Sequence, residues 1–118
     1  LYYRANTSGT THPAYRKDLT TGDWVAVNGV GVDEESNIYD YRDNHTLVSL
    51  GKPWVAGWPT NPEARHDMVN PAVFYGKTWN DRIDIEAGRP YNTDTYILIS
   101  AGFDGVYGND DDVFNFGL

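Results

Sequence analysis

The chain has 118 residues, of which 40% are hydrophobic, enough for one modest core and too few for two, so a single domain spanning residues 1–118 is expected. Its 17 acidic and 9 basic residues give a formal net charge of −8, which disfavours nucleic acid as a partner and favours cations. The absence of cysteine excludes disulfides and thiolate metal sites and leaves the compartment open.

No run in the sequence approaches the roughly 20 apolar residues of a membrane-spanning helix. No basic segment followed by an apolar one marks a signal peptide either. The chain begins at Leu1, without Met, and enters an apolar, strand-like segment at once. We therefore expect that processing or truncation removed an earlier segment, through which any contact with a membrane would be made.

Five short strands are predicted along the chain, because Gly, Pro, Asn and Asp interrupt every longer pattern. The run Tyr96–Ser100 is the best candidate for a central strand, since it is apolar on both faces and is expected to lie in the core. The five predicted strands are Leu1–Arg4, Asp23–Val27, Thr46–Leu50, Tyr96–Ser100 and Val113–Phe116.

One or two helical turns are predicted to begin at Asn61, an N-cap residue that precedes Pro62 at the first helical position. Pro71 is expected to end that helix, and a second short helix is predicted over Ala72–Lys77. The acidic stretch 32–44 indicates an exposed loop or a pair of edge strands. Together these elements predict an α+β fold dominated by an antiparallel sheet.

The segment 100–113 contains no Lys or Arg and holds four aspartates within nine positions, namely Asp104, Asp110, Asp111 and Asp112. Mutual repulsion would oppose a compact turn there unless a cation lies among the carboxylates. Calcium fits best, because it accepts about six to eight oxygen ligands in irregular geometry, whereas magnesium requires a strict octahedron. A solvated acidic turn is the competing interpretation. The segment joins two predicted core strands, however, where uncompensated charge is costly.

Two familiar calcium patterns do not match this segment. The EF-hand fails because no Asp-x-Asp/Asn-x-Asp/Asn-Gly run ends in Glu at the last position. The glycine-rich nonapeptide of parallel β-helices is echoed once, at Gly108–Asp110, and that architecture requires repeats. A different family accounts for the spacing better.

The stretch Tyr96–Gly105, followed by Asp111 and Asp112, resembles the C-terminal calcium loop of type II secretion major pseudopilins and related prepilin-type (type IV pilin-like) proteins. In that family a strand ends in a Ser-Leu/Ala-Gly-x-Asp-Gly turn. A pair of residues ending in Asp then closes the loop seven and eight positions after the first Asp, the spacing of Asp111 and Asp112 from Asp104. Residues 1–5 and 88–92 also look like the body of such proteins.

The resemblance implies a non-enzymatic structural subunit of an extracellular pilus or pseudopilus that serves protein transport, located in the periplasm or at the cell surface. Its partners would be other pilin or pseudopilin subunits. The family's Phe-Thr-Leu-x-Glu start and long apolar helix, which form the filament core and membrane anchor, are absent from these residues and are expected to precede Leu1. The implied calcium ligands are the side chains of Asp104, Asp111 and Asp112, with backbone carbonyls around Ser100, Ala101 and Asn109.

Catalytic chemistry has weaker support in the sequence. The histidines His12, His45 and His66 lie far apart, without a zinc-binding spacing, and are expected at the surface. No serine occupies a Gly-x-Ser-x-Gly elbow. The acidic pairs Glu34 with Glu35, and Asp81 with Asp84 or Glu86, could serve a glycosidase in principle, but acidic surface is the better interpretation.

The tryptophans suggest a second function class. Indole faces stack on sugar rings, and Trp54, Trp58 and Trp79 have Phe74 and Tyr75 nearby in sequence. Burial competes with this interpretation, because a domain with 14% aromatic residues must place several of them in its core. The alternative to a pilin-like subunit is therefore a free-standing, calcium-dependent carbohydrate-binding or adhesive β domain. Exposed indoles beside the metal would favour that alternative.

Overall fold

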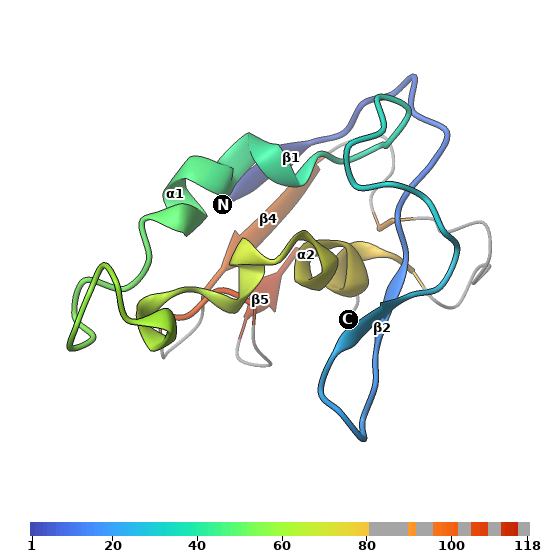
Figure 1. Cartoon of the computed structure of the whole chain (residues 1–118). Helices are drawn as coiled ribbons and strands as arrows, with labels where there is room; N and C mark the ends of the chain where they lie inside the picture. The colour runs from blue at the N-terminus through green and yellow to red at the C-terminus, as the bar shows by residue number, and fades with distance from the viewer. Residues whose placement is uncertain (81–89, 92–95, 102–104, 109–111, 116–118) are drawn as a thin grey trace.

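The structure is a computed structural model, which describes residues 1–80, 90–91, 96–101, 105–108 and 112–115. These residues form a mixed fold of short strands, two α-helices and three 3₁₀ helices, consistent with the predicted α+β class (Figure 1). The elements are β1 Tyr2–Arg4, β2 Tyr15–Lys17, β3 Trp24–Ala26, η1 Tyr41–Asn44, α1 His45–Ser49, η2 Pro62–Ala64, η3 Asp67–Val69, α2 Pro71–Thr78, β4 Tyr96–Ser100 and β5 Val113–Phe114.

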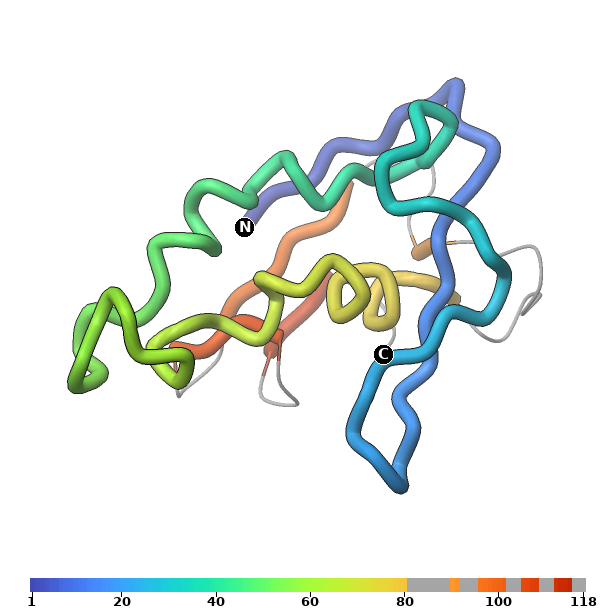
Figure 2. The backbone as a smooth tube through the Cα atoms, in the orientation of Figure 1, coloured from blue at the N-terminus to red at the C-terminus, as the bar shows by residue number. Residues whose placement is uncertain are grey.

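The larger sheet is antiparallel in the order β1-β4-β5, so β4 is the central strand, as predicted. Figure 2 shows the first residues of the chain running beside the segment that carries β4. Burial alternates along β4: Ile97 and Ile99 lie in the core, whereas Tyr96 and Leu98 are more than 40% exposed. The prediction that the whole run is core was therefore wrong for one face, because the other face of this sheet is left open to solvent.

The smaller sheet is a hairpin of β2 and β3, whose register places Lys17 opposite Trp24 and Tyr15 opposite Ala26. Strand β3 lies within a predicted strand, but β2 was not predicted. The hairpin is fixed to α2 and the residue after it, because the indole N–H of Trp79 donates to the Tyr15 carbonyl at 3.0 Å. Figure 1 shows it projecting away from the larger sheet.

Helix α2 begins as its sequence indicates: the Asn70 side chain accepts a hydrogen bond from the Ala72 N–H at 3.1 Å, and Pro71 occupies the first turn. The predicted helix over Ala72–Lys77 is confirmed. At Asn61 the same kind of cap starts only the 3₁₀ turn η2, so the expected role of Pro71 as a terminator was wrong. A residue with a fixed φ suits the start of a helix better than its end.

The segment Thr46–Leu50, predicted as a strand, belongs to helix α1 instead. The β-branched residues of this segment favour a strand, which is why the prediction was wrong. In the structure Val48 is the one buried residue of α1, while Leu47 and Leu50 are exposed. The helix continues directly from η1, which the Asp40 carboxylate caps by accepting from the backbone N–H of Arg42. Local capping upstream therefore outweighs the β propensity of a few residues.

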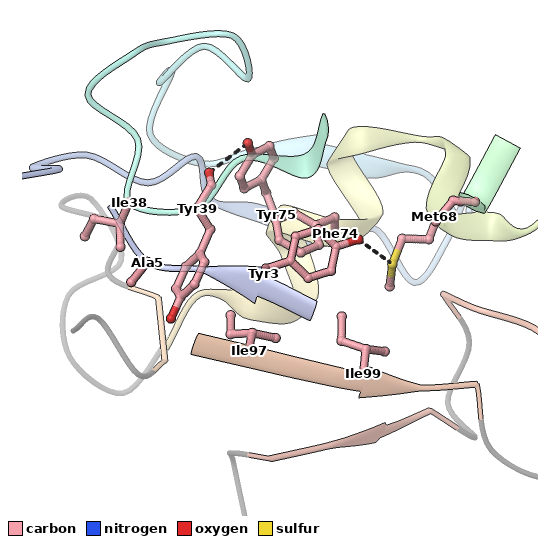
Figure 3. Packing of buried hydrophobic residues seen from close by; sticks show 10 residues of the cluster. Tyr3, Ala5, Ile38, Tyr39, Met68, Phe74, Tyr75, Ile97 and Ile99 are labelled. Carbon is pink, nitrogen blue, oxygen red and sulfur yellow. Dashed lines mark hydrogen bonds between the residues drawn. The ribbon is translucent and has the colours of Figure 1, made fainter. Parts of the chain in front are cut away.

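The core forms between the larger sheet and α2, and its largest side chains are aromatic: Tyr3, Phe74 and Tyr75 are fully buried there (Figure 3). The Tyr75 hydroxyl donates to the Tyr39 carbonyl and accepts from the Tyr41 N–H, both at 3.1 Å. The stretch 32–44 is thus not simply an exposed loop or edge-strand pair, because Asn37, Ile38 and Tyr39 are buried. In the described part of the chain, none of the helices has the length and apolar character needed to span a membrane.

Candidate functional site

The predicted metal loop begins at the end of β4 and returns at β5. Ser100 pairs with Val113 across these two strands, which brings Ser100 and Ala101 to the same end of the sheet as Asp112. Ala101 is buried and Ser100 is exposed. Three of the predicted ligands, Asp104, Asn109 and Asp111, lie outside the described residues.

The Asp112 carboxylate closes the described part of this loop. Its Oδ2 atom accepts a hydrogen bond from the Gly108 N–H at 2.7 Å, and its Oδ1 atom is buried. Gly108 adopts a φ of +103°, which is accessible to glycine and strained for other residues. A negative charge is therefore held against a backbone turn, at a place where charge is expensive unless it is compensated.

The same turn docks onto η3 and the residue before it through two hydrogen bonds, one between backbone groups and one to a side chain. The Met68 N–H donates to the Tyr107 carbonyl at 3.2 Å, and the Tyr107 N–H donates to Nδ1 of His66 at 3.1 Å. A Cβ on Gly108 would lie 2.6 Å from the Met68 nitrogen, so any larger residue would separate the two backbones. Tyr3 extends the connection to the core, because its hydroxyl lies 3.9 Å from the Met68 sulfur (Figure 3).

His66 is the centre of an aromatic cluster beneath the loop. Its ring contacts Tyr107 edge-on at a centroid distance of 5.2 Å, and Trp54 lies on another side at 6.4 Å. Burial, with a smaller effect from the positive charge of Lys52, lowers the pKa of His66. Because Nδ1 accepts the Tyr107 N–H, the ring is neutral and carries its proton on Nε2.

His12 is also buried, against the expectation of surface histidines. Its ring packs edge-on against Tyr75 at 5.2 Å, and Nε2 lies 3.2 Å from the Thr78 hydroxyl. That hydroxyl donates to the Phe74 carbonyl at 2.8 Å, so Nε2 carries the proton and donates to Thr78. Burial lowers the pKa of His12 to about 3. The expectation was wrong for His12 and His66 because both fill space between aromatic rings, a role that leaves no local sequence pattern.

The tryptophans divide between core and surface. Trp79 is buried, so the burial interpretation was correct for that residue, as it was for Phe74 and Tyr75. Trp54 and Trp58 are 64% and 43% exposed. Trp58 is held by its indole N–H, which donates to the Leu50 carbonyl at 2.7 Å. A Cβ on Gly105 would lie 3.6 Å from the Trp54 ring, which places that exposed indole beside the C-terminal loop.

Of the two acidic pairs considered for catalysis, the structure describes only the first. Glu34 and Glu35 are exposed, and residues 81–86 lie outside the described ranges. No group of three His, Cys, Asp or Glu side chains with metal-binding geometry occurs within the described part of the chain. That part excludes Asp104 and Asp111, so the predicted calcium shell remains a prediction.

The described geometry can hold a rigid acidic turn against a hydrophobic platform. Asp112 was identified from the sequence, but the platform of Trp54, His66 and Met68 was missed, because these residues lie some 40 positions or more from Tyr107 in sequence. The one available signal was Gly108, because a glycine can mark a positive φ or a close backbone approach.

In comparisons with known proteins, no family model, no curated protein and no solved structure matched the chain.

Proposed function

We propose that the chain is the globular part of an extracytoplasmic, non-enzymatic subunit of a pilin-like or pseudopilin-like filament, stabilised by calcium in its C-terminal loop. The main support is the partly buried Asp112 carboxylate, whose Oδ2 atom accepts from the Gly108 N–H and whose Oδ1 atom is buried. A structural ion at this position would hold the last strand against the central strand of the sheet. Other subunits of the same kind would then meet a rigid surface.

Calcium suits this loop for an electrostatic reason. The four aspartates between positions 104 and 112 have no Lys or Arg within their own segment, and the Oδ1 atom of Asp112 is buried. A divalent ion among them would replace repulsion by coordination, and folding would then be coupled to binding. The proposed shell combines side-chain oxygens of Asp104, Asp111 and Asp112 with backbone carbonyls of Ser100, Ala101 and Asn109.

Thermal unfolding in calcium and in chelator tests this proposal. With a Kd on the order of 10⁻⁴ to 10⁻³ M, as in extracellular modules, millimolar calcium would raise the melting temperature by several degrees. Replacing Asp104 or Asp111 by Ala, or Asp112 by Asn, should remove that dependence. Asp23→Asn is the matched control, because Asp23 is exposed at the β2–β3 hairpin, far in sequence from the loop. Identical melting in calcium and EDTA would overturn the proposal.

A carbohydrate-binding or adhesive domain is the second candidate, favoured by the exposure of Trp54 beside Gly105. An indole face at the rim of a calcium-stabilised loop could stack on a sugar ring. Trp54→Ala should then abolish calcium-dependent retention on a neutral polysaccharide, measured below the melting temperature of the variant in calcium. Equal retention of the variant and the parent protein would remove this candidate.

A further inference from the structure

A cleft of about 430 Å³ opens between the β2–β3 hairpin, helix α2 and the C-terminal loop. This volume falls within the range of small-molecule sites. The hairpin contributes Lys17 and Trp24 to its wall, and α2 with the residues before it contributes Asp67, Val73 and Lys77. Neither proposed function uses this cleft, and its main aromatic residue, Trp24, is not among the tryptophans considered above.

Trp24 is fixed in this cleft rather than free to move. It is only partly exposed, and a Cβ on Gly76 would lie 2.3 Å from Cζ3 of the indole, so the six-membered ring rests directly on the backbone of α2. Directly paired residues of an antiparallel hairpin point to the same face. Lys17, opposite Trp24, therefore extends along the same side of the hairpin as the indole.

The charges of the cleft are unusual for a chain of net charge −8. Among the described residues that line it, two carry ammonium groups, Lys17 and Lys77, and one carries a carboxylate, Asp67. Among the described residues, the one ion pair joins Arg42 and Asp40, and Lys17 takes no part in it. The exposed Lys17 ammonium beside a fixed indole can make a charge-assisted hydrogen bond to an anionic ligand.

We propose that this cleft binds one unit of an acidic sugar, a hexuronic acid, with the C–H face of its ring on the Trp24 indole and its carboxylate at Lys17. Lys77 adds positive charge on the opposite wall. The Asp67 carboxylate suits a sugar better than a planar aromatic anion, because it can accept hydrogen bonds from ring hydroxyls. The pocket beside Trp58 differs, since Arg65 is the one charged side chain among the described residues that line it.

The test is an NMR titration of the whole chain with D-galacturonate, following the four indole N–H resonances in two-dimensional ¹⁵N spectra. Trp24→Phe assigns the Trp24 resonance by its loss. We expect D-galacturonate to shift that resonance with a Kd on the order of 1 mM, which is typical of a single sugar unit in a shallow site. D-galactose lacks the carboxylate and acetate lacks the sugar ring, so each should bind at least about tenfold more weakly than D-galacturonate.

Lys17→Glu should weaken D-galacturonate binding by about tenfold or more, because it reverses the charge that meets the carboxylate. Arg16→Glu is the matched control: Arg16 precedes Lys17 on β2, pairs with Val25 and points to the opposite face, so it should leave the Kd unchanged. Both side chains are exposed, so both variants are expected to fold.

Three results would overturn the proposal: equal loss of affinity in the Lys17 and Arg16 variants, equal affinity for acetate and D-galacturonate, or shifts confined to the resonances of Trp54 and Trp58. The titration is run in calcium and in EDTA. If D-galacturonate binds at Trp24 in both conditions, the sugar-binding proposal is supported even if calcium has no effect on the melting temperature. The failure of one proposal can therefore be distinguished from the failure of the other.

Discussion

The backbone N–H of Tyr107 donates to Nδ1 of His66 at 3.1 Å, which attaches the C-terminal loop to a side chain from the middle of the chain. The acceptor is available only while the imidazole is neutral. Burial, with a smaller effect from Lys52, lowers the pKa of His66 and outweighs the opposing effects of the Gly51 backbone and the Asp67 carboxylate. One of the two hydrogen bonds that attach the loop therefore depends on a titratable group.

Acid should loosen this attachment. The folded-state pKa of His66 lies below its ordinary value of about 6.5, so the unfolded chain binds a proton more readily than the folded chain. Stability from this residue is complete above about pH 6.5 and is lost as the pH falls toward the folded-state pKa, with a slope of at most about 1.4 kcal/mol per pH unit. Urea unfolding between pH 5 and 8 measures the slope.

His66→Phe keeps an aromatic ring between Trp54 and Tyr107 but removes the acceptor, which should cost about 1–3 kcal/mol at pH 8 and flatten the slope. His45→Gln is the control at pH 8, because His45 is only partly buried and its replacement should cost well under about 1 kcal/mol there. A slope that survives His66→Phe would show that other groups carry the acid sensitivity.

Gly108→Ala tests the close approach of the loop to η3. The substitution forces a φ of +103° on alanine and places its Cβ 2.6 Å from the Met68 nitrogen, a backbone atom that cannot rotate away. We expect a loss of about 2–4 kcal/mol, the strained conformation and the forced separation together. Gly22→Ala is matched in conformation, with a φ of +78°, but meets nothing within 4 Å, so it should cost only about 1 kcal/mol. Equal losses would argue against the close contact.

The helices and strands that are specified by residues within or next to them could be predicted from the sequence. Asn70 followed by Pro71 specifies the start of α2 through one side-chain cap, and the apolar run of β4 identifies the centre of the larger sheet. The His45–Ser49 helix and the β2 strand were not predicted, because their conformations are set by neighbours: η1 leads into the helix, and β2 is held by β3 and Trp79. Local propensity is weak where such contacts decide.

The residues of the candidate site also divide into those that the sequence identifies and those that only the fold brings together. Acidic spacing identified Asp112 as a loop residue, since charge repulsion among neighbours can be read directly from the sequence. His66 and Trp54 could not be identified, because their contact with the loop arises only when a helix and a sheet bring distant segments together. The cleft at Trp24 depends likewise on its approach to Gly76, some fifty positions away.

The buried His12 should give a second, distinct acid dependence. With a folded-state pKa of about 3, it contributes stability that is full above about pH 6.5 and is lost progressively down to about pH 3. Replacing both hydrogen-bond partners, as in His12→Phe with Thr78→Val, removes this titration and leaves stability near neutral pH within about 1–2 kcal/mol. Urea titrations of the parent and the double variant at pH 5 and 7 compare the two. An unchanged pH difference would contradict the assignment.

The Tyr75 hydroxyl should contribute to stability out of proportion to its size. It joins three segments, accepting from the Tyr41 N–H at 3.1 Å and donating toward the carbonyls of Tyr39 and Val32 at 3.1 and 3.3 Å. Tyr75→Phe keeps the buried ring but leaves these backbone groups without their partner, so we expect a loss of about 1–3 kcal/mol.

Urea unfolding should show the loss in Tyr75→Phe as a lower midpoint with an unchanged m-value, because the surface exposed on unfolding stays the same. The matched control is Tyr2→Phe, since Tyr2 is half exposed on the open face of the sheet and its hydroxyl makes no hydrogen bond among the described residues. Amide exchange adds a local reading: the Tyr41 N–H should lose protection in Tyr75→Phe and keep it in Tyr2→Phe. Retained protection in both would mean that the Tyr41 amide has another acceptor, and the stabilising role of this hydroxyl would fall with it.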